Sequence, residues 1–339
     1  MFAVHAAEGR PYLARTALLG RRALRLLKTR ETASRLLNLR DAFDRLEYWL
    51  TGSALDAGMQ LYELARYYVP DEYARVLRLR LPPYVKLLAA NDFPRTTLTT
   101  RLSGANSIFY GPFRSRVAAE TFEGQFLELF QIRRCQEDLS PSPDHPGCIY
   151  GEMNKCLRPC QAAVGPDEYA REVTRARDFL LSNGLSLVKS IAAARDSLSQ
   201  EMEFEEAARQ HTRLEKVEEV LALRGPFAGS LDQLHVAAFT RSARPNAVDL
   251  FLFRGGHWQG RSTIDFDLVE GKPVSVDRKL REVLGSVPEI RSSVREREER
   301  LAIFARWAYS TWRDGELLVF PNFEDPPIRK LVNAIARVM

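Results

Sequence analysis

Apolar and polar residues follow two different periods along this chain, and the changes of period predict its elements. Residues 2–15, FAVHAAEGRPYLAR, predict a strand or hairpin with a turn at the EGR segment. Helical spacing follows over about 16–50 and again over 55–69. Prolines then punctuate two short strand candidates within 81–104. A Gly-Pro turn next leads into a predicted amphipathic helix whose apolar side carries Phe122, Phe126 and Leu129.

Helical spacing dominates again from Pro166 to Arg224, interrupted by a single Asn-Gly pair. In the segment MEFEEAARQHTRLEKVEEVLALR, apolar residues recur at spacings of seven, three and four: Ala207, Leu214, Val217 and Leu221. Glu205 and Arg209 lie one turn apart and can form an ion pair. We therefore expect this segment to be one arm of a helical hairpin.

After the GPFAG segment, the spacing of apolar residues changes to every second residue, which is typical of strands. LHVAAFT and AVDLFLFRGGHWQGRSTIDFDL predict three strands with a Gly-Gly turn at 255–256, and His257 beside that turn is predicted to lie on the surface. The last fifty residues predict helix, strand and helix, with GELLVF as the strand. A chain of 339 residues exceeds what one core usually organises, so the pattern predicts a multidomain α+β protein.

Composition is that of a folded protein, with 45% hydrophobic and 27% charged residues. No apolar run is long enough to span a membrane, and the N-terminus lacks the order of a signal peptide, so we expect a cytoplasmic protein without membrane partners. The formal net charge is +5, which is compatible with a polyanionic partner. Glu31 is the single acid among these basic residues of 10–40: Arg10, Arg15, Arg21, Arg22, Arg25, Lys28, Arg30, Arg35 and Arg40. They could contact phosphates or form the solvated face of a helix.

Four cysteines fall at Cys135, Cys148, Cys156 and Cys160, with gaps of twelve, seven and three residues. In a reducing compartment such a group favours metal ligation over disulfides. Four thiolates complete a tetrahedral zinc site or anchor a cubane iron–sulfur cluster. The absence of a Cys-x-x-Cys pair favours the cluster over zinc, and buried free thiols are the third possibility.

The segments FYGPFRS at 109–115, FQIRRC at 130–135 and CIYGEMNKCLRPC at 148–160 resemble motifs of the UvrC family, YFGPY.S, LRTC and C..Y.IGRC.APC. UvrC is the bacterial excinuclease subunit that incises damaged double-stranded DNA beside the helicase UvrB. The resemblance implies a [4Fe-4S] cluster on the four cysteines, with zinc as the alternative. Such a cluster would fix a loop too small to build its own core.

The segment MEFEEAARQHTRLEKV resembles the UVR motif, LEFE.AA..RD.I, through which UvrC docks on UvrB. Carried onto this chain, the resemblance implies partner-binding residues at Phe204, Glu205, Ala207, Ala208, Arg209 and Leu214. The alternative is an ordinary acidic amphipathic helix.

The resemblance extends to the family's N-terminal GIY-YIG nuclease, whose chemistry needs tyrosines, an arginine and a metal-binding glutamate. Leu13 stands where the catalytic tyrosine belongs, and Leu61 where the glutamate belongs. Arg22 could be a remnant of the catalytic arginine. Asp56 or Glu63 could compensate for the missing glutamate, and magnesium is implied only in that case. The DNA-binding residues implied here are Arg15, Arg21, Arg22, Arg25 and Lys28.

Residues 233–270 resemble the entry into the family's C-terminal RNase H-like nuclease, but no matching first aspartate or histidine follows. We therefore expect four parts: a degenerate GIY-YIG-like domain at 1–95, a cysteine segment at 96–165, a UVR helical region at 166–230 and a partial C-terminal domain at 231–339. The function implied is a DNA-binding, UvrB-docking excision repair protein with lost or weakened nuclease activity. The alternatives are an active excinuclease subunit and a metal-stabilised DNA-binding regulator unrelated to repair.

Overall fold

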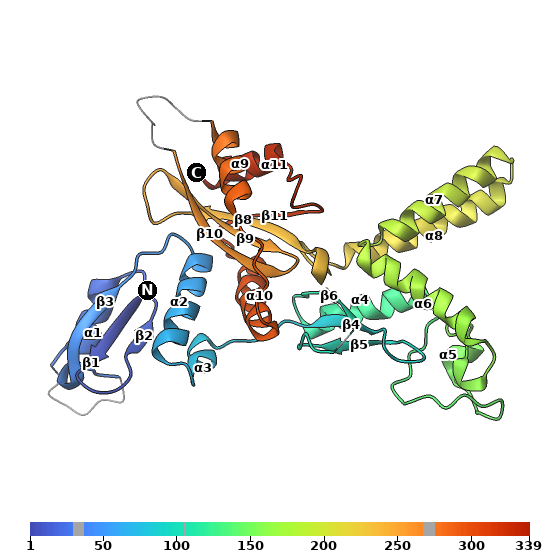
Figure 1. Ribbon diagram of the computed structural model, residues 1–339, viewed down its shortest axis with the longest axis horizontal. Coiled ribbons are helices and arrows are strands. Elements are labelled where there is room, and N and C mark those ends of the chain that lie inside the picture. Colours follow the sequence, from blue (N-terminus) through green and yellow to red (C-terminus); the bar gives the residue numbers. More distant parts are fainter. Residues whose placement is uncertain (30–36, 105, 267–274) are drawn as a thin grey trace.

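The computed structural model describes residues 1–29, 37–104, 106–266 and 275–339. Within them the predicted α+β class is confirmed, because helices accompany three antiparallel sheets. Figure 1 shows an elongated molecule, with the N-terminal unit at one end, a C-terminal sheet beside it, and a helical hairpin that projects from the middle unit. No helix in the described part of the chain is both long and apolar enough to cross a membrane.

The N-terminal unit is a three-stranded sheet with the strand order β2-β1-β3, flanked by helices. Its elements are β1 (Phe2–Ala6), β2 (Tyr12–Ala14), α1 (Leu19–Leu27), η1 (Arg40–Ala42), β3 (Phe43–Tyr48), α2 (Ala54–Tyr68) and α3 (Tyr73–Leu77). The predicted hairpin at 2–15 and the predicted helix at 55–69 are both confirmed.

The predicted helix over 16–50 is wrong in its second half. Only α1 is α-helical in the described part of that stretch, and residues 30–36 lie outside the described residues. Residues 43–48 form β3, which pairs antiparallel with β1. Phe2 and Val4 of β1 are buried, and β3 supplies the second set of backbone hydrogen bonds that such a buried strand needs. Tertiary pairing therefore overrides the helical spacing of apolar residues in this segment.

The middle unit is a four-stranded sheet with the order β5-β4-β6-β7. Its elements are β4 (Tyr84–Leu88), β5 (Thr96–Thr99), β6 (Ser107–Gly111), α4 (Arg116–Glu128) and β7 (Gly229–Ser230). Ser115 caps α4 by accepting a hydrogen bond from the Ala118 amide at 3.2 Å. Phe122 and Phe126 are buried in this unit's core as predicted, and Leu129 packs beside them. The domain boundary expected at residue 95 falls between the paired strands β4 and β5, and the four-part division stays a prediction.

Helices follow the cysteine segment, and two of them form the projecting hairpin (Figure 1). The elements are α5 (Ile149–Glu152), η2 (Pro159–Gln161), α6 (Pro166–Leu181), α7 (Leu185–Gln200) and α8 (Phe204–Ala222). The Asn-Gly pair separates α6 from α7, and a second break at 201–203 separates α7 from α8. Ala207 and Val217 are buried in the predicted apolar seam. Arg209, however, pairs with Glu206 at 2.6 Å rather than with Glu205.

The C-terminal unit is an antiparallel sheet with the order β10-β9-β8-β11. Its elements are η3 (Leu231–Gln233), β8 (His235–Arg241), β9 (Ala247–Arg254), β10 (His257–Asp265), α9 (Val276–Ser286), α10 (Val294–Ala308), β11 (Gly315–Phe320) and α11 (Ile328–Val338). The helix α10 covers one face, and α9 and α11 cover the other (Figure 1). The three strands, the Gly-Gly turn and the final helix, strand and helix all agree with the sequence pattern.

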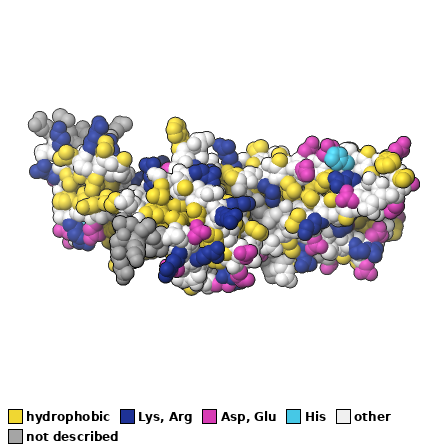
Figure 2. Space-filling model, turned by 90° about the horizontal axis from the view of Figure 1, so that it is seen from above, with side chains coloured by type: hydrophobic (Ala, Val, Ile, Leu, Met, Phe, Trp, Pro, Cys, Tyr) yellow, Lys and Arg dark blue, Asp and Glu magenta, His cyan; other side chains and the backbone are white. Residues whose placement is uncertain are grey.

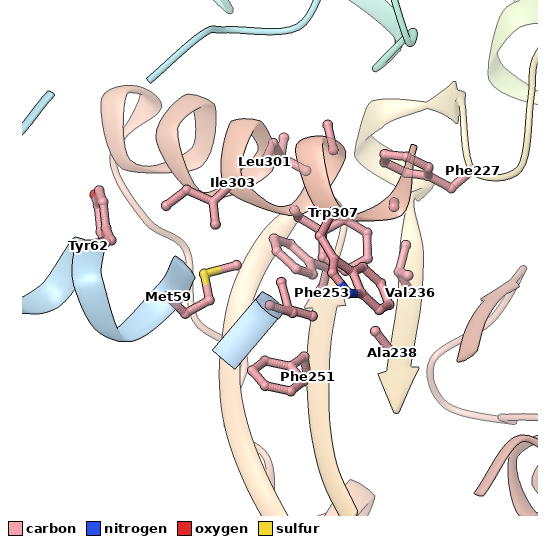
Figure 3. Packing of buried hydrophobic residues seen from close by; sticks show 14 of the residues in the cluster. Met59, Tyr62, Phe227, Val236, Ala238, Phe251, Phe253, Leu301, Ile303 and Trp307 are labelled. Carbon is pink, nitrogen blue, oxygen red and sulfur yellow. The ribbon is translucent and has the colours of Figure 1, made fainter. Parts of the chain in front are cut away.

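One hydrophobic core joins the units. Figure 3 shows Met59 and Tyr62 of α2 facing Leu301 and Ile303 of α10, with strand residues of the C-terminal sheet beneath. Tyr84 and Phe109 of the middle sheet belong to the same buried cluster. The units are therefore packed against one another through buried side chains, rather than connected by linkers alone.

Candidate functional site

The four cysteines lie on the loop and short helices that follow α4. Cys148 precedes α5 as its N-cap residue, Cys160 lies within η2, and Cys156 lies between these two turns. Cys156 and Cys160 are buried, Cys148 is exposed and Cys135 is intermediate. All four are free thiols.

Electrostatic interactions show that the four sulfurs lie in one neighbourhood. Burial, with smaller contributions from Cys135, Cys148 and Cys160, raises the pKa of Cys156 to about 11. Burial also raises the pKa of Cys160, with added effects from Cys148 and Cys135. In the described residues, no three His, Cys, Asp or Glu side chains stand close enough together to hold a metal ion as placed. The loop thus gathers the thiols without arranging them in ligand geometry.

Backbone and side-chain donors surround these sulfurs. The Arg158 amide donates to Cys156 Sγ at 3.4 Å, and Arg133 Nη1 donates to Cys135 Sγ at 3.7 Å. Backbone N–H groups of Gln161 and Cys160 oppose the raised pKa of the Cys160 thiol. Donors of this kind stabilise the thiolate, which is the form that binds metals. The chemistry of this set therefore fits a thiolate-bound zinc ion or iron–sulfur cluster.

The loop is fastened to the rest of the middle unit by polar contacts. The Leu157 amide donates to the Gln131 carbonyl at 3.0 Å. The hydroxyl of Tyr169 on α6 accepts from the Arg133 amide at 3.0 Å and donates to the Pro94 carbonyl at 2.8 Å. The first bond ties the two ends of the cysteine segment to each other, and Tyr169 ties the end near Cys135 to α6 and to the segment between β4 and β5.

The two positions that would carry nuclease chemistry in the N-terminal unit hold packed leucines. Leu13 and Leu61 both lie against a small apolar cluster of Met1, Ala57 and Leu64. Neither side chain can donate a proton or bind a metal ion. Arg22, the possible remnant, is half-buried.

Arg22 turns toward the sheet, where its Nη2 donates to the Tyr12 hydroxyl at 2.9 Å. Arg15, Arg21, Arg25 and Lys28 are exposed. Their side chains have no ionic partner among the described residues and are free to contact an anion. Arg30 and Arg35 lie outside the described residues. Figure 2 shows Lys and Arg side chains along the whole face that it presents, with acidic side chains between them, so basic charge is not confined to the N-terminal unit.

The two carboxylates that could rebuild a metal site are each neutralised by an arginine of the C-terminal unit. Asp56 is buried and forms an ion pair with Arg261 of β10. Glu63 forms an ion pair with Arg300 of α10. Burial raises the pKa of Asp56, and Arg261 opposes that effect. These pairs hold α2 against the C-terminal unit and leave neither carboxylate free as a magnesium ligand.

A polar cluster in the N-terminal unit was missed by the sequence analysis. Glu47 of β3 accepts from Arg45 Nε at 3.0 Å and from the Tyr68 hydroxyl at 3.0 Å. Its Oε2 lies 3.1 Å from Nε2 of the buried His5. The bonds from Arg45 and Tyr68 lower the pKa of Glu47. These residues come from β1, β3 and α2, and the prediction of a helix over 43–48 concealed their proximity.

The residues implied in partner docking divide between the two faces of α8. Phe204 is 66% exposed at the free end of the hairpin. Glu205, Ala208 and Arg209 are also exposed. Ala207 is buried and Leu214 half-buried, because the apolar seam turns both toward the interior of the hairpin. Any docking contact in this set would therefore involve Phe204 and its exposed neighbours.

His257 differs from its prediction as a surface residue. Its ring is partly buried, and Nδ1 lies 3.0 Å from the Ser292 hydroxyl and accepts from the Ser292 amide at 3.2 Å. Burial, reinforced by Arg297 and Arg291, lowers the pKa of His257 to about 4. The imidazole is thus neutral near pH 7 and serves as a structural acceptor.

Comparison with known proteins agrees with the cysteine loop and its sheet. The family model for the UvrC/Cho excinuclease middle domain matches residues 82–179. UvrABC system protein C of Rickettsia rickettsii is 26% identical over 211 residues, which is 62% of this chain and 33% of that protein. The Moorella thermoacetica protein of the same name is 28% identical over 215 residues, 63% of this chain and 35% of that protein.

A third relative, UvrABC system protein C of Lachnospira eligens, is 23% identical over 265 residues, 77% of this chain and 43% of that protein. The matched segments thus span between about a third and two fifths of these curated relatives. No solved structure matches the chain.

The class of protein is defined by the β4–β6 sheet, α4 and the cysteine loop, which together form a middle domain of the UvrC/Cho excinuclease type. Beyond that domain, the chain is similar to UvrABC system protein C over 62% to 77% of its length.

Proposed function

We propose that this chain is a DNA-binding protein of nucleotide excision repair that docks on UvrB and has little or no nuclease activity. The observation that carries the loss of cutting is the packing of Leu13 and Leu61 within an apolar cluster of the N-terminal unit. Metal-assisted hydrolysis of a phosphodiester needs a carboxylate and a proton-transfer group at these positions. The role in repair is supported by the match to the UvrC/Cho middle domain and by the UvrABC relatives.

The proposed partner contact is the exposed end of the α7–α8 hairpin. Phe204 and Met202 are 66% and 77% exposed there. Exposed apolar side chains at the tip of a projecting element are typical of a docking site. The N-terminal unit would be the degenerate GIY-YIG-like domain, and 231–339 would be what remains of the C-terminal nuclease.

The four cysteines would hold the proposed [4Fe-4S] cluster, with zinc as the alternative. When bound, such a group would crosslink the loop through its thiolate ligands. Burial of Cys156 and Cys160 and the amide donors around them support this assignment. After anaerobic iron and sulfide reconstitution we expect broad absorbance at about 400 nm, whereas a colourless protein with one zinc per chain would favour the alternative.

The deciding experiment is a magnesium-dependent nicking assay on ultraviolet-damaged plasmid, with and without UvrB. We expect no nicking above background, together with UvrB-dependent retention of the damaged plasmid by this chain. UvrABC system protein C from one of the relatives serves as the positive control. Nicking that depends on this chain would instead establish the active excinuclease. DNA retention without any capture of UvrB would favour the DNA-binding regulator unrelated to repair.

A further inference from the structure

A cavity of about 750 Å³ lies between the middle unit and α10 of the C-terminal unit. Four arginines line it: Arg80, Arg114, Arg116 and Arg306. Among the described residues, no Asp or Glu contributes to its wall. Pro82, Leu98 and Tyr309 supply apolar surface to its wall. The cavity is therefore strongly basic, with an apolar surface next to the charges.

The positive charge in this cavity is largely uncompensated. Arg80 and Arg114 are exposed, and their guanidinium groups have no hydrogen-bonding or ionic partner in the described part of the chain. Arg116 pairs through Nε with Glu120 at 2.8 Å. Arg306 donates from Nη1 to the Leu77 carbonyl at 3.1 Å, which is a neutral acceptor. Arginines gathered in this way repel one another, and a bound anion would relieve that repulsion.

Arg15 extends this basic region toward the N-terminal unit. Burial lowers the pKa of Arg306, and the nearby charge of Arg15 lowers it further. Arg15 is exposed at the start of the segment that leads to α1, whose exposed arginines continue along the surface. Arg15 is therefore close enough to Arg306 to add its positive charge to that of the cavity.

The backbone adds a second favourable element to the arginines. The helix α4 begins at Arg116, and Ser115 and Arg116 both line the cavity. The first amides of a helix carry partial positive charge and have no intrahelical acceptor. Phosphate groups bind at helix ends of this kind when cationic side chains stand beside them.

We propose that this cavity binds the phosphodiester backbone of a DNA strand, with a sugar and base against the apolar wall. The proposal rests on the DNA-binding role given above and assigns a site to it. A volume of about 750 Å³ can hold a nucleotide unit with its flanking phosphates. The site needs both units, because Arg80, Arg114 and Arg116 come from one side and Arg306 from α10. The Tyr309 hydroxyl, which donates to the Pro112 carbonyl at 2.7 Å, fixes α10 against the middle unit beside the cavity.

The test compares DNA affinity of the full chain with that of the double variant R80Q/R114Q, by fluorescence anisotropy of a labelled single-stranded oligonucleotide and its duplex. We expect binding to weaken by roughly tenfold to a hundredfold at low salt. The slope of log K against log salt should fall by about two. R329Q, which removes an exposed arginine of α11 on the opposite face of the C-terminal sheet, should leave both quantities unchanged. The side chains of Arg80 and Arg114 are exposed and have no partner among the described residues, so the melting temperature of R80Q/R114Q should match that of the parent chain.

Equal affinity and equal salt slope for R80Q/R114Q and the parent chain would overturn the proposal. Competition with deoxynucleoside monophosphate and inorganic pyrophosphate separates a nucleic-acid site from a small-phosphate site. Displacement of the oligonucleotide by either compound at micromolar concentration would overturn the assignment to DNA. If UvrB capture fails while R80Q/R114Q still loses DNA affinity, the repair role falls and the cavity assignment stands. If UvrB capture succeeds while R80Q/R114Q binds DNA as tightly as the parent chain does, the cavity assignment falls and the repair role stands.

Discussion

The carboxylate of Glu299 on α10 shows how single residues join the units. It accepts hydrogen bonds from the hydroxyls of Tyr62 and Tyr73 and from Arg295 Nε. Burial, followed by the hydrogen bond and charge of Glu299, raises the pKa of both tyrosines. A buried carboxylate is costly unless donors surround it, and here three donors do so. The neighbouring Arg300 lies over the Tyr62 ring at 4.4 Å, which adds a cation–π contact at the same junction.

At the same scale, we expect His257 to make stability depend on pH. Its pKa is lowered in the folded protein to about 4, from an ordinary value of 6.5. Between these two values the unfolded chain binds a proton that the folded chain does not, so the free energy of unfolding should fall as pH falls from 6.5 to 4. H257N keeps an acceptor near Ser292 and removes the titration, so its free energy of unfolding should fall less over the same range.

Urea denaturation at several pH values between neutral and acidic measures this difference. H211N, at an exposed position on α8, is the matched control and should follow the parent profile. The account of His257 fails if the parent and H257N lose stability in parallel.

At the scale of elements, the hairpin of α7 and α8 is stabilised along its inner seam and leaves its far end uncovered. Leu187 and Ile191 of α7 are buried with Val217 and Val220 of α8. Beyond that core the chain turns at 201–203, where Met202 and Phe204 are exposed. The element therefore presents apolar side chains without depending on them for its own packing.

F204A should abolish or strongly weaken capture of UvrB. An apolar anchor at the centre of an interface contributes about 2 kcal/mol or more, so its removal should weaken the affinity at least about thirtyfold. The free energy of unfolding should change by less than about 0.5 kcal/mol, because the side chain is exposed. Isothermal titration calorimetry with UvrB measures the affinity. L185A, at an exposed position at the opposite end of α7, is the control, and equal affinities for F204A and L185A would rule out the docking role.

The elements also show where sequence patterns sufficed. The segment 54–68 has an N-cap serine and sustained helical spacing, and it forms α2 as predicted. The segment 43–48 became a strand because β1 needed a second partner, a requirement that local spacing does not contain. The two-residue strand β7 pairs with β6 across more than a hundred residues, and two residues carry no periodicity at all.

Candidate sites divide in the same way. Spacing and order identified the four cysteines, because all of them lie within one short segment. The basic cavity could not be identified, because Arg80, Arg114 and Arg306 are distant in sequence and meet only after the units pack. Burial of Leu13 and Leu61 in one cluster likewise required the structure, although the sequence already showed the missing functional groups.

At the scale of the whole molecule, the N-terminal unit and the C-terminal sheet share a core and also touch through their backbones. A side chain on Gly52, just before α2, would place its Cβ 2.1 Å from the Arg241 carbonyl oxygen at the end of β8. Only glycine permits this approach of the N-terminal unit to the C-terminal sheet. The Ala54 amide donates nearby to Asp314 at 2.6 Å, and Trp307 Nε1 donates to the same carboxylate at 2.7 Å. The docking of these units is thus specified by polar geometry as well as by apolar burial.

Because this core is common to the units, we expect F304A to destabilise them together. The Phe304 ring is fully buried, with ring centroids 4.7 Å from Phe253 and 5.4 Å from Phe227. Its truncation should lower the free energy of unfolding by about 3–5 kcal/mol, through lost burial and the cavity left behind.

Fluorescence measures the unfolding of each unit separately. Trp49 reports on the N-terminal unit and Trp258 on the C-terminal sheet, when each is kept as the single tryptophan of its variant. The unfolding midpoints measured by both probes and by far-ultraviolet circular dichroism should fall to the same lower value, since both units contribute side chains to the core around Phe304. L24A, at a position 73% exposed on α1, should leave the midpoint unchanged. If F304A moved the Trp258 transition while the Trp49 transition stayed in place, the units would be independent folding domains, and the DNA cavity between α10 and the middle unit would lose its rigid frame.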